Sequence, residues 1–350
     1  RSHFGSSGLL ALRCRGLRPC PRAEAGEPSM TGGGEDGPSP VPSPPSRPTG
    51  HRRRQRSRKD ALEALLGAGG GLPSRASTLD PKCMVSHLPQ AAAEAVLRYG
   101  ALAFGEGSDE VSRCLESAAE ACPEGLRVKE LLENLEAYRE IAAFAHDAGK
   151  RKPLETIYDM ACGHGLLGLL LAYRFPTLKV VCVDTSKRPV FDALVQGFRT
   201  HGVALGGEPE PLTNLRFEEA DALSLQLPPN SMVVAVHACN ALNRQLLDVA
   251  VAAGAVWAVL PCCIRAGTYL PCRVGGALKD EDDVTHTLNC GVIAGLYRAE
   301  RLQTIDRRIT NRNIVICGGL GLEDYAAACE LCNEGRPSKD RLMSTSSNFP

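Results

Sequence analysis

Three carboxylates lie at or near the ends of consecutive strand-like runs: Asp159 in TIYDMAC, Asp184 in KVVCVD and Asp221 in FEEADAL. The first run leads into the turn ACGHG, where Gly163 and Gly165 let the backbone approach a ligand closely. In a parallel sheet the carboxyl ends of the strands share one edge, and a loop entering a helix presents free N–H groups there. We therefore expect the acids and the turn to form one binding site.

The three acids favour a cationic nucleoside without phosphates, because a pyrophosphate would be repelled. Asp159 is expected to face an ammonium group, Asp184 to accept from both ribose hydroxyls, and Asp221 to accept from an adenine amino group. Gly163, Gly165 and Gly168 also fit the G-x-G-x-x-G frame of an NAD-binding protein. An NAD-type oxidoreductase is therefore an alternative, which the three acids disfavour.

The elements that must position these residues alternate between strand and helix. Five strand-like runs cover residues 156–162, 179–185, 215–222, 232–239 and 256–263, and helix-like runs cover 166–175, 188–202 and 242–254. This alternation predicts an α/β fold with a parallel sheet covered on both faces. Two further β-like runs within 302–319 predict a closing hairpin with an antiparallel strand, which a plain dinucleotide-binding fold does not require.

With these features the chain resembles the class I S-adenosylmethionine-dependent methyltransferases over about residues 128–320. The resemblance implies a Rossmann-like, mostly parallel seven-stranded sheet with an antiparallel closing hairpin and an N-terminal helical cap. It also implies that S-adenosylmethionine is the cofactor. Ala161 stands where the family usually has Gly, and Ala is small enough for binding. The implied cofactor-binding residues are Asp159, Ala161, Gly163, Gly165, Asp184, Asp221 and Ala222.

A finer resemblance rests on the segment VHACNALNRQLLDVAVAAGAVWAVLPCCI. It looks like a subgroup whose fourth strand ends in His-x-Cys and whose fifth ends in Pro-Cys-Cys. That subgroup includes the methyltransferase domain of a protein resembling glutathione S-transferase C-terminal domain-containing protein. The segment is also similar to the domain of tRNA ribose 2′-O-methyltransferases. The resemblance implies an RNA acceptor, tRNA first, methylated on oxygen or nitrogen.

The candidate catalytic residues are His237, Cys239, Asn240 and Cys262, because the fourth strand ends beside the methyl group in this fold. His237 is either a general base or a histidine that orders the loop. Cys239, Cys262 and Cys263 end adjacent strands, and we expect them to be pocket-wall residues. Covalent catalysis and a zinc site with His237 are the alternatives, and no metal is predicted. An Asp/Asn-Pro-Pro-aromatic motif is absent, which disfavours an adenine-N6 type enzyme.

Composition limits the other classes. Lys+Arg and Asp+Glu each total 40, so the formal net charge is zero and no global field favours nucleic acid or a membrane. The apolar runs are too short to span a bilayer. The 15 cysteines are scattered and several lie in apolar runs, which is typical of reduced thiols inside the cell. We expect the cytoplasm, with a mitochondrion or plastid or the nucleus as alternatives.

The chain divides into four predicted regions. Residues 1–77 form a Gly-, Pro- and Ser-rich disordered leader, whose Arg- and Ser-rich start resembles a transit peptide. Residues 78–150 form the helical cap, 151–322 the methyltransferase domain, and 323–350 a C-terminal helix and tail with a weak C-x-x-C pair, Cys329 and Cys332. The alternative function is a non-catalytic methyltransferase-fold binding or regulatory protein. The oligomeric state is left open.

Overall fold

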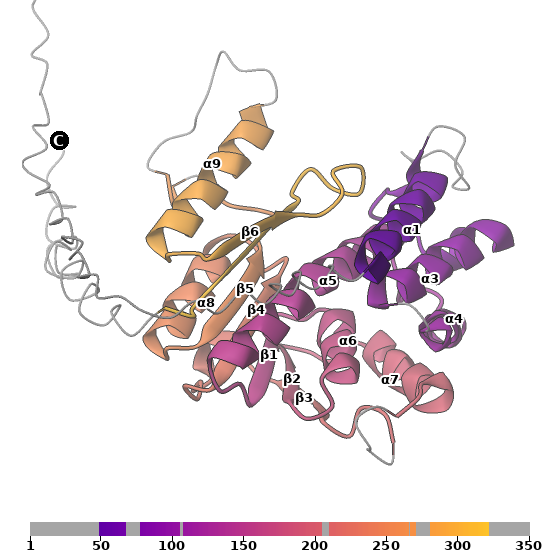
Figure 1. Cartoon of the computed structure of the whole chain (residues 1–350), viewed down its shortest axis with the longest axis horizontal. Helices are drawn as coiled ribbons and strands as arrows, with labels where there is room; N and C mark the ends of the chain where they lie inside the picture. Colours follow the sequence, from indigo (N-terminus) through magenta and orange to yellow (C-terminus); the bar gives the residue numbers. More distant parts are fainter. Residues whose placement is uncertain are drawn as a thin grey trace, which may run out of the picture. The chain divides into compact units, whose positions relative to one another are not determined.

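A computed structural model describes residues 49–67, 78–105, 108–204, 210–265, 267–270 and 281–321 (Figure 1). All of them belong to one compact unit, Thr49–Pro350. The predicted C-terminal helix with its C-x-x-C pair lies outside the described residues, and so does the predicted leader before residue 49. None of the described helices is long and apolar enough to cross a membrane.

The centre of the fold is a seven-stranded sheet with the order β3-β2-β1-β4-β5-β7-β6. Strands β1 to β5 are parallel, whereas β7 runs antiparallel to both β5 and β6. The predicted parallel sheet and closing hairpin are therefore confirmed. The strands are β1 Thr156–Met160, β2 Lys179–Asp184, β3 Leu215–Glu219, β4 Ser231–Val236, β5 Val256–Leu260, β6 Arg301–Thr304 and β7 Ile314–Gly318.

Helices cover both faces of the sheet (Figure 1). Ile157 and Val234 belong to the core that packs against α5, α6 and α7. Their neighbours Tyr158 and Val233 belong to the second core, which includes residues of α8 and α9. Because side chains alternate along a strand, the apolar runs supply both cores. The helices are α5 Val128–Arg151, α6 Leu166–Arg174, α7 Pro189–His201, α8 Ala241–Ala252 and α9 Glu281–Leu296.

The N-terminal helices pack beside this layer. The 3-10 helix η1 covers Val85–His87, α3 covers Gln90–Phe104 and α4 covers Asp109–Ala121. Helix α4 crosses α7 at Gly197, where an added Cβ would lie 2.4 Å from the carbonyl oxygen of Cys114. The missing side chain at Gly197 therefore allows the two helix backbones to meet.

The leader prediction is wrong for one segment, because Thr49–Leu66 forms helix α1. In KDALEALL the apolar residues recur at helical spacing, and Leu62, Leu65 and Leu66 are buried. The basic, Pro-rich sequence before these residues is typical of a disordered segment and hides this short apolar stripe. Burial of three leucines stabilises a helix that its polar half would not form alone.

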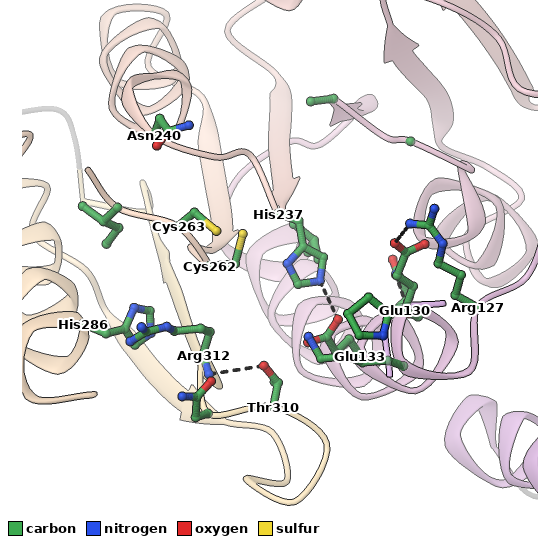
Figure 2. A pocket seen from close by; sticks show the side chains of 18 of the residues that line it. Arg127, Glu130, Glu133, His237, Asn240, Cys262, Cys263, His286, Thr310 and Arg312 are labelled. Carbon is green, nitrogen blue, oxygen red and sulfur yellow. Dashed lines mark hydrogen bonds and ion pairs between the residues drawn. The ribbon is translucent and has the colours of Figure 1, made fainter. Parts of the chain in front are cut away.

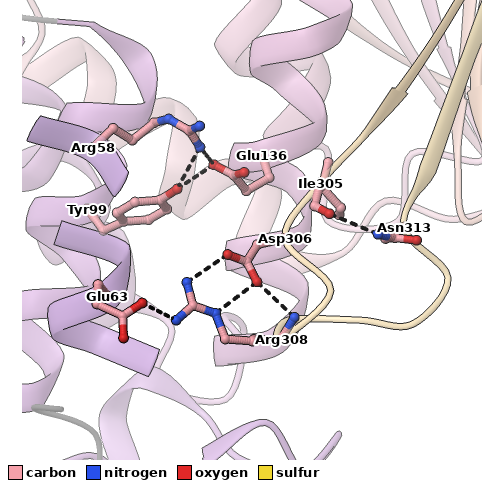
Figure 3. Close-up of polar contacts among 8 residues, drawn as sticks. All are labelled: Arg58, Glu63, Tyr99, Glu136, Ile305, Asp306, Arg308 and Asn313. Carbon is pink, nitrogen blue, oxygen red and sulfur yellow. Dashed lines mark hydrogen bonds and ion pairs between the residues drawn. The ribbon is translucent and has the colours of Figure 1, made fainter. Parts of the chain in front are cut away.

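Polar contacts hold α1 in place (Figure 3). Arg58 donates from Nη1 to Glu136 Oε1 of α5 at 2.5 Å, and Tyr99 donates to the same carboxylate oxygen. Glu63 of α1 forms an ion pair with Arg308 at 2.5 Å. The buried contact at Glu136 links α1 to α5, and the exposed ion pair of Glu63 links α1 to the loop between β6 and β7.

The basic cluster Arg307, Arg308 and Arg312 pairs with acids. Arg308 donates from Nη2 to Asp306 Oδ2 at 2.8 Å, and Arg307 donates to Asp283 Oδ2 at 2.7 Å. Burial raises the pKa of Asp306, but the hydrogen bonds and charge of Arg308 outweigh it and leave the pKa below its usual value. These ion pairs fix the loop that covers one side of the site described next.

Candidate active site

A cavity of about 720 Å³ opens at the carboxyl edge of the sheet (Figure 2). Its walls come from segments that are far apart in the chain. They are the turn after β1, the ends of β2, β4 and β5, the first turns of α5, helix α9 and the loop between β6 and β7. This is the edge where an open α/β sheet binds its ligands.

The turn after β1 has an unusual backbone. Gly163 and Gly165 have φ of 61° and 74°, and Ala161, which is not a glycine, has φ of 54°. A left-handed conformation costs an L-residue about 1–2 kcal/mol. Space around Gly163 is open, so its conformation rather than crowding calls for glycine. The fold therefore keeps this turn shape even at Ala161.

Asp184 lies beside the turn, as predicted. Its Oδ2 accepts a hydrogen bond from the Gly163 N–H at 2.8 Å, and its Oδ1 accepts from the Thr185 N–H at 2.8 Å. Ala161, Gly163 and Asp184 all line the cavity. The turn after β1 and the second-strand acid thus form one wall.

Asp159 lies differently from the expectation. It is buried on the α6 side of the sheet, where its Oδ2 accepts from the Gly168 N–H at 2.8 Å. Burial raises its pKa to about 7, with the Gly168 hydrogen bond opposing and the charge of Asp184 adding to the effect. It is not among the described residues that line the cavity. Its position in β1 directs the side chain to the α6 face of the sheet, beneath the turn, where it supports the start of α6.

The third-strand pair also lies outside the cavity wall. Asp221 is exposed and caps the short 3-10 helix η2, Ala222–Ser224, by accepting from the Leu223 N–H at 3.0 Å. Ala222 is buried in the second core. The sequence placed both residues at the correct strand end, whereas the cavity in the described structure ends short of them.

His237 follows β4 directly and lines the cavity with φ of 63°. Its N–H donates to the carbonyl oxygen of Leu260 at 3.1 Å, which ties the end of β4 to the end of β5. Its Nε2 lies 3.1 Å from Oε2 of Glu133 in α5 (Figure 2). The Leu260 bond thus holds the backbone of His237, and one nitrogen of its ring lies against the Glu133 carboxylate.

Glu133 is the residue that the sequence reasoning missed. It is 2% exposed, and its Oε1 lies 3.2 Å from Lys129 Nζ. Burial raises its pKa, but hydrogen bonding and charge from His237, followed by Lys129 and Thr310, outweigh burial and leave the pKa below its usual value. Glu133 is therefore ionised at neutral pH. The available signal was an acid inside the apolar helical run VKELLENLEAY.

A second histidine, His164, lies inside the turn and was also missed. It is buried, and its Nδ1 accepts from the Leu166 N–H at 3.1 Å. Burial lowers its pKa to about 4, although Glu130 opposes the effect. Since Nδ1 is an acceptor and the ring is neutral, Nε2 carries the proton and faces Glu130 Oε2 at 3.9 Å. His164 therefore shapes the turn, and the lone pair of its Nδ1 is occupied by the Leu166 N–H.

The three predicted thiols do meet. Cys239 Sγ lies 3.1 Å from Cys262 Sγ, and the sulfur atoms of Cys239, Cys262 and Cys263 all lie within 4.8 Å of one another. Asn240, with φ of 59°, lines the cavity and donates its N–H to the Cys263 carbonyl at 2.6 Å. The ends of β4 and β5 therefore bring all the candidate catalytic residues to one edge.

Helix α9 adds polar groups that the sequence reasoning did not identify. His286 and Asn289 line the cavity and are 4% and 3% exposed. His286 Nδ1 and Asn289 Oδ1 are buried without a hydrogen-bond partner within the described residues. Burial, with help from Arg312, lowers the pKa of His286 to about 4, so it is neutral. Unpaired buried polar atoms at a cavity wall favour a polar ligand there.

Residues 128–266 match a family model described as "Methyltransferase domain". A curated relative, the glutathione S-transferase C-terminal domain-containing protein of Xenopus laevis, is 29% identical over 112 residues. The match covers 32% of this chain and 16% of that protein. The matched segment is therefore a small part of that relative.

Solved structures with a similar chain path include a Pyrococcus abyssi tRNA (uracil-54, C5)-methyltransferase in complex with S-adenosyl-L-homocysteine. It is 13% identical, with a TM-score of 0.32, and the match covers 53% of this chain and 37% of that one. An O-methyltransferase family protein from Burkholderia thailandensis is 14% identical, with a TM-score of 0.32 and coverage of 77% and 95%. Likenesses at this level do not bear on the substrate.

The family match begins at the first residue of α5 and ends just after the strand-end thiols, so it contains Glu133, the turn, Asp184 and His237. The sheet has the seven strands, mostly parallel, and the antiparallel closing hairpin that the resemblance implied. Residues 128–266 of this chain are therefore similar to a methyltransferase domain, within a sheet that is mostly parallel and has an antiparallel β7.

Proposed function

We propose that the domain transfers the methyl group of S-adenosylmethionine to an oxygen or nitrogen of RNA, with tRNA as the first candidate, and that His237 is the general base. The observation that carries this proposal is the contact of 3.1 Å between His237 Nε2 and the buried carboxylate of Glu133. A carboxylate in this position selects the imidazole tautomer and stabilises the imidazolium that forms.

The cofactor is proposed to lie along the turn and Asp184. The N–H groups and left-handed backbone of the turn accept its methionine end, and the remaining lone pairs of Asp184 accept from the ribose hydroxyls. Asp159 supports this surface from below through Gly168 rather than by direct contact. The role of Asp221 and Ala222 beside the adenine remains a proposal from the resemblance.

The reaction needs little beyond positioning and one proton transfer. The acceptor atom attacks the methyl carbon as the carbon–sulfur bond breaks, and the leaving group is S-adenosylhomocysteine. With the proton on Nε2, which lies 3.1 Å from Glu133 Oε2, Nδ1 of His237 is the acceptor for the proton of the attacking group. Alignment of the acceptor with the sulfonium supplies most of the rate gain.

Two features support a polar acceptor of this kind. His286 and Asn289 present unpaired polar atoms to the cavity, and these can hydrogen-bond a nucleoside edge or hydroxyl. Arg188 and Arg265 are exposed at the cavity wall, where they can contact phosphates. The zero net charge means that phosphate binding would be local. RNA itself rests on the resemblance to tRNA methyltransferases.

The test is methyl transfer from labelled S-adenosylmethionine to separate pools of tRNA, rRNA, protein and small metabolites. We expect label in tRNA that ribonuclease releases, and loss of that label in His237→Ala with cofactor affinity retained in calorimetry. Label in another pool would overturn the RNA acceptor. Cofactor binding without transfer to any pool would favour the non-catalytic alternative.

A further inference from the structure

The three thiols at the ends of β4 and β5 have no role in the proposed reaction. Two of them, Cys262 and Cys263, line the cavity, and Figure 2 shows their sulfur atoms close together. Among the described residues, they and Cys239 form the single group of three or more metal-binding side chains that lie close together. We propose that Cys239, Cys262 and Cys263 bind one Zn²⁺ ion through three thiolates.

The spacing of the sulfur atoms fits such an ion. A tetrahedral zinc site with Zn–S bonds of about 2.3 Å places its sulfur atoms about 3.8 Å apart. Here the sulfur atoms lie within 4.8 Å of one another, and the Cys239–Cys262 pair is 3.1 Å apart. Small side-chain rotations would bring all three to the required separation, without a change in the backbone.

The backbone holds the three residues in register. His237 N–H bonds to the Leu260 carbonyl at 3.1 Å, and Asn240 N–H bonds to the Cys263 carbonyl at 2.6 Å. These two bonds connect the segment that carries Cys239 to the segment that carries the other two thiols. The ligands are therefore arranged before a metal arrives, which lowers the ordering cost of binding.

The protonation of the thiols makes binding dependent on pH. Zn²⁺ binds cysteine in its thiolate form. When Zn²⁺ binds, three S–H groups lose their protons as three Zn–S bonds form, so metal affinity rises with pH.

The fourth coordination position would face the cavity. Cys263 is exposed, and both Cys262 and Cys263 belong to the cavity wall. Three protein ligands with one open position is the pattern of zinc sites that hold a water molecule. Reversible oxidation of Cys239 and Cys262 to a disulfide is the competing chemistry, but it would leave Cys263 unused and needs an external oxidant.

The experiment measures zinc in the full chain, purified with a thiol reductant and without chelators, by elemental mass spectrometry. We expect Cys239→Ser/Cys262→Ser to contain one zinc ion fewer per chain than the wild type. Cys329→Ser/Cys332→Ser and Cys83→Ser serve as matched controls and should keep that ion. Replacement by Co²⁺ should give a near-ultraviolet sulfur-to-cobalt absorption band that is lost only in the first variant.

Cys263→Ser guards against a folding failure of the double variant, because Cys263 is exposed. It should weaken Zn²⁺ affinity by more than the 10- to 100-fold that loss of a supporting group typically costs. Equal zinc content in the wild type and both variants would overturn the proposal, as would a mass loss of two hydrogens showing a Cys239–Cys262 disulfide in reductant. Cofactor binding is measured separately, so failure of the zinc site leaves the methyltransferase proposal intact.

Discussion

At the residue scale, the site depends on residues whose backbone or side chain is held in an unfavourable state. Ala161 and His237 both adopt positive φ, and Glu133 is an ionised carboxylate with almost no exposure. Such states persist only where the surroundings hold them, and they gather at functional sites. Here each of the three lines the same cavity.

The first prediction concerns Glu133. Glu133→Gln should lower kcat about 10²- to 10³-fold, because the amide cannot stabilise the imidazolium of His237. Cofactor affinity, measured by calorimetry, should stay within about twofold. Glu136→Gln is the matched control: it is equally buried on the same helix, but its partners are Arg58 and Tyr99. An equal loss of kcat in both variants would contradict a role for Glu133 at His237.

The second prediction concerns Asp159. Its pKa of about 7 in the fold exceeds the unfolded value near 4, so the folded state binds more protons between these values. Its contribution to stability is therefore full below about pH 4 and is lost as pH rises through 7. Asp159→Asn should gain stability relative to the wild type by up to about 1.4 kcal/mol per pH unit between pH 5 and 7. Urea unfolding at pH 5, 6 and 7 measures the difference in unfolding free energy between the two proteins. A difference that stays constant with pH would show that the pKa of the Asp159 carboxyl is not raised.

At the element scale, the strands and central helices can be predicted from the sequence, whereas the place where α5 packs on the sheet cannot. Apolar runs of strand length and the intervening helical periods predict β1 to β5 and α6 to α8, because local burial patterns determine them. The contact of Glu133 with His237 spans about a hundred residues and depends on where α5 docks. No local pattern encodes that contact, and so the sequence pointed to His237 without pointing to Glu133.

The third prediction tests the crossing of α4 and α7. Gly197→Ala should destabilise the protein by at least about 1 kcal/mol, because the new Cβ would lie 2.4 Å from the Cys114 carbonyl. Gly291→Ala in α9 is the control, since an added Cβ there meets nothing within 4 Å and Ala favours a helix by up to about 1 kcal/mol. The two changes should shift the urea midpoint in opposite directions; shifts of the same sign would contradict the close approach.

The fourth prediction tests the docking of α1. Leu65→Ala should cost about 2–4 kcal/mol of unfolding free energy, because Leu65 is buried in the core cluster. Lys59→Ala, at an exposed position on the same helix, should change it by less than about 0.5 kcal/mol. If the two variants unfold alike in urea, α1 does not pack as described.

At the scale of the whole molecule, ligand binding and folding are linked. The fifth prediction is that S-adenosylhomocysteine at 100 times its Kd stabilises the full chain by about 2.7 kcal/mol. Asp184→Ala should remove most of this gain, because the carboxylate that holds Gly163 and is proposed to bind the ribose is lost. Asp192→Ala, whose partner is Lys187, should keep it. Thermal unfolding with and without ligand measures both; an unchanged gain in Asp184→Ala would refute the ribose assignment.

The insertion of β7 between β5 and β6 has a practical consequence for anyone who shortens the chain. A fragment limited to residues 128–266 would end before α9 and before both strands of the hairpin. Strand β5, whose Trp257 is fully buried, would become an unpaired apolar edge, and such edges promote aggregation. It would also lack the wall formed by His286 and Arg312. An expression fragment that keeps the enzyme whole must therefore run from α1 through at least residue 318.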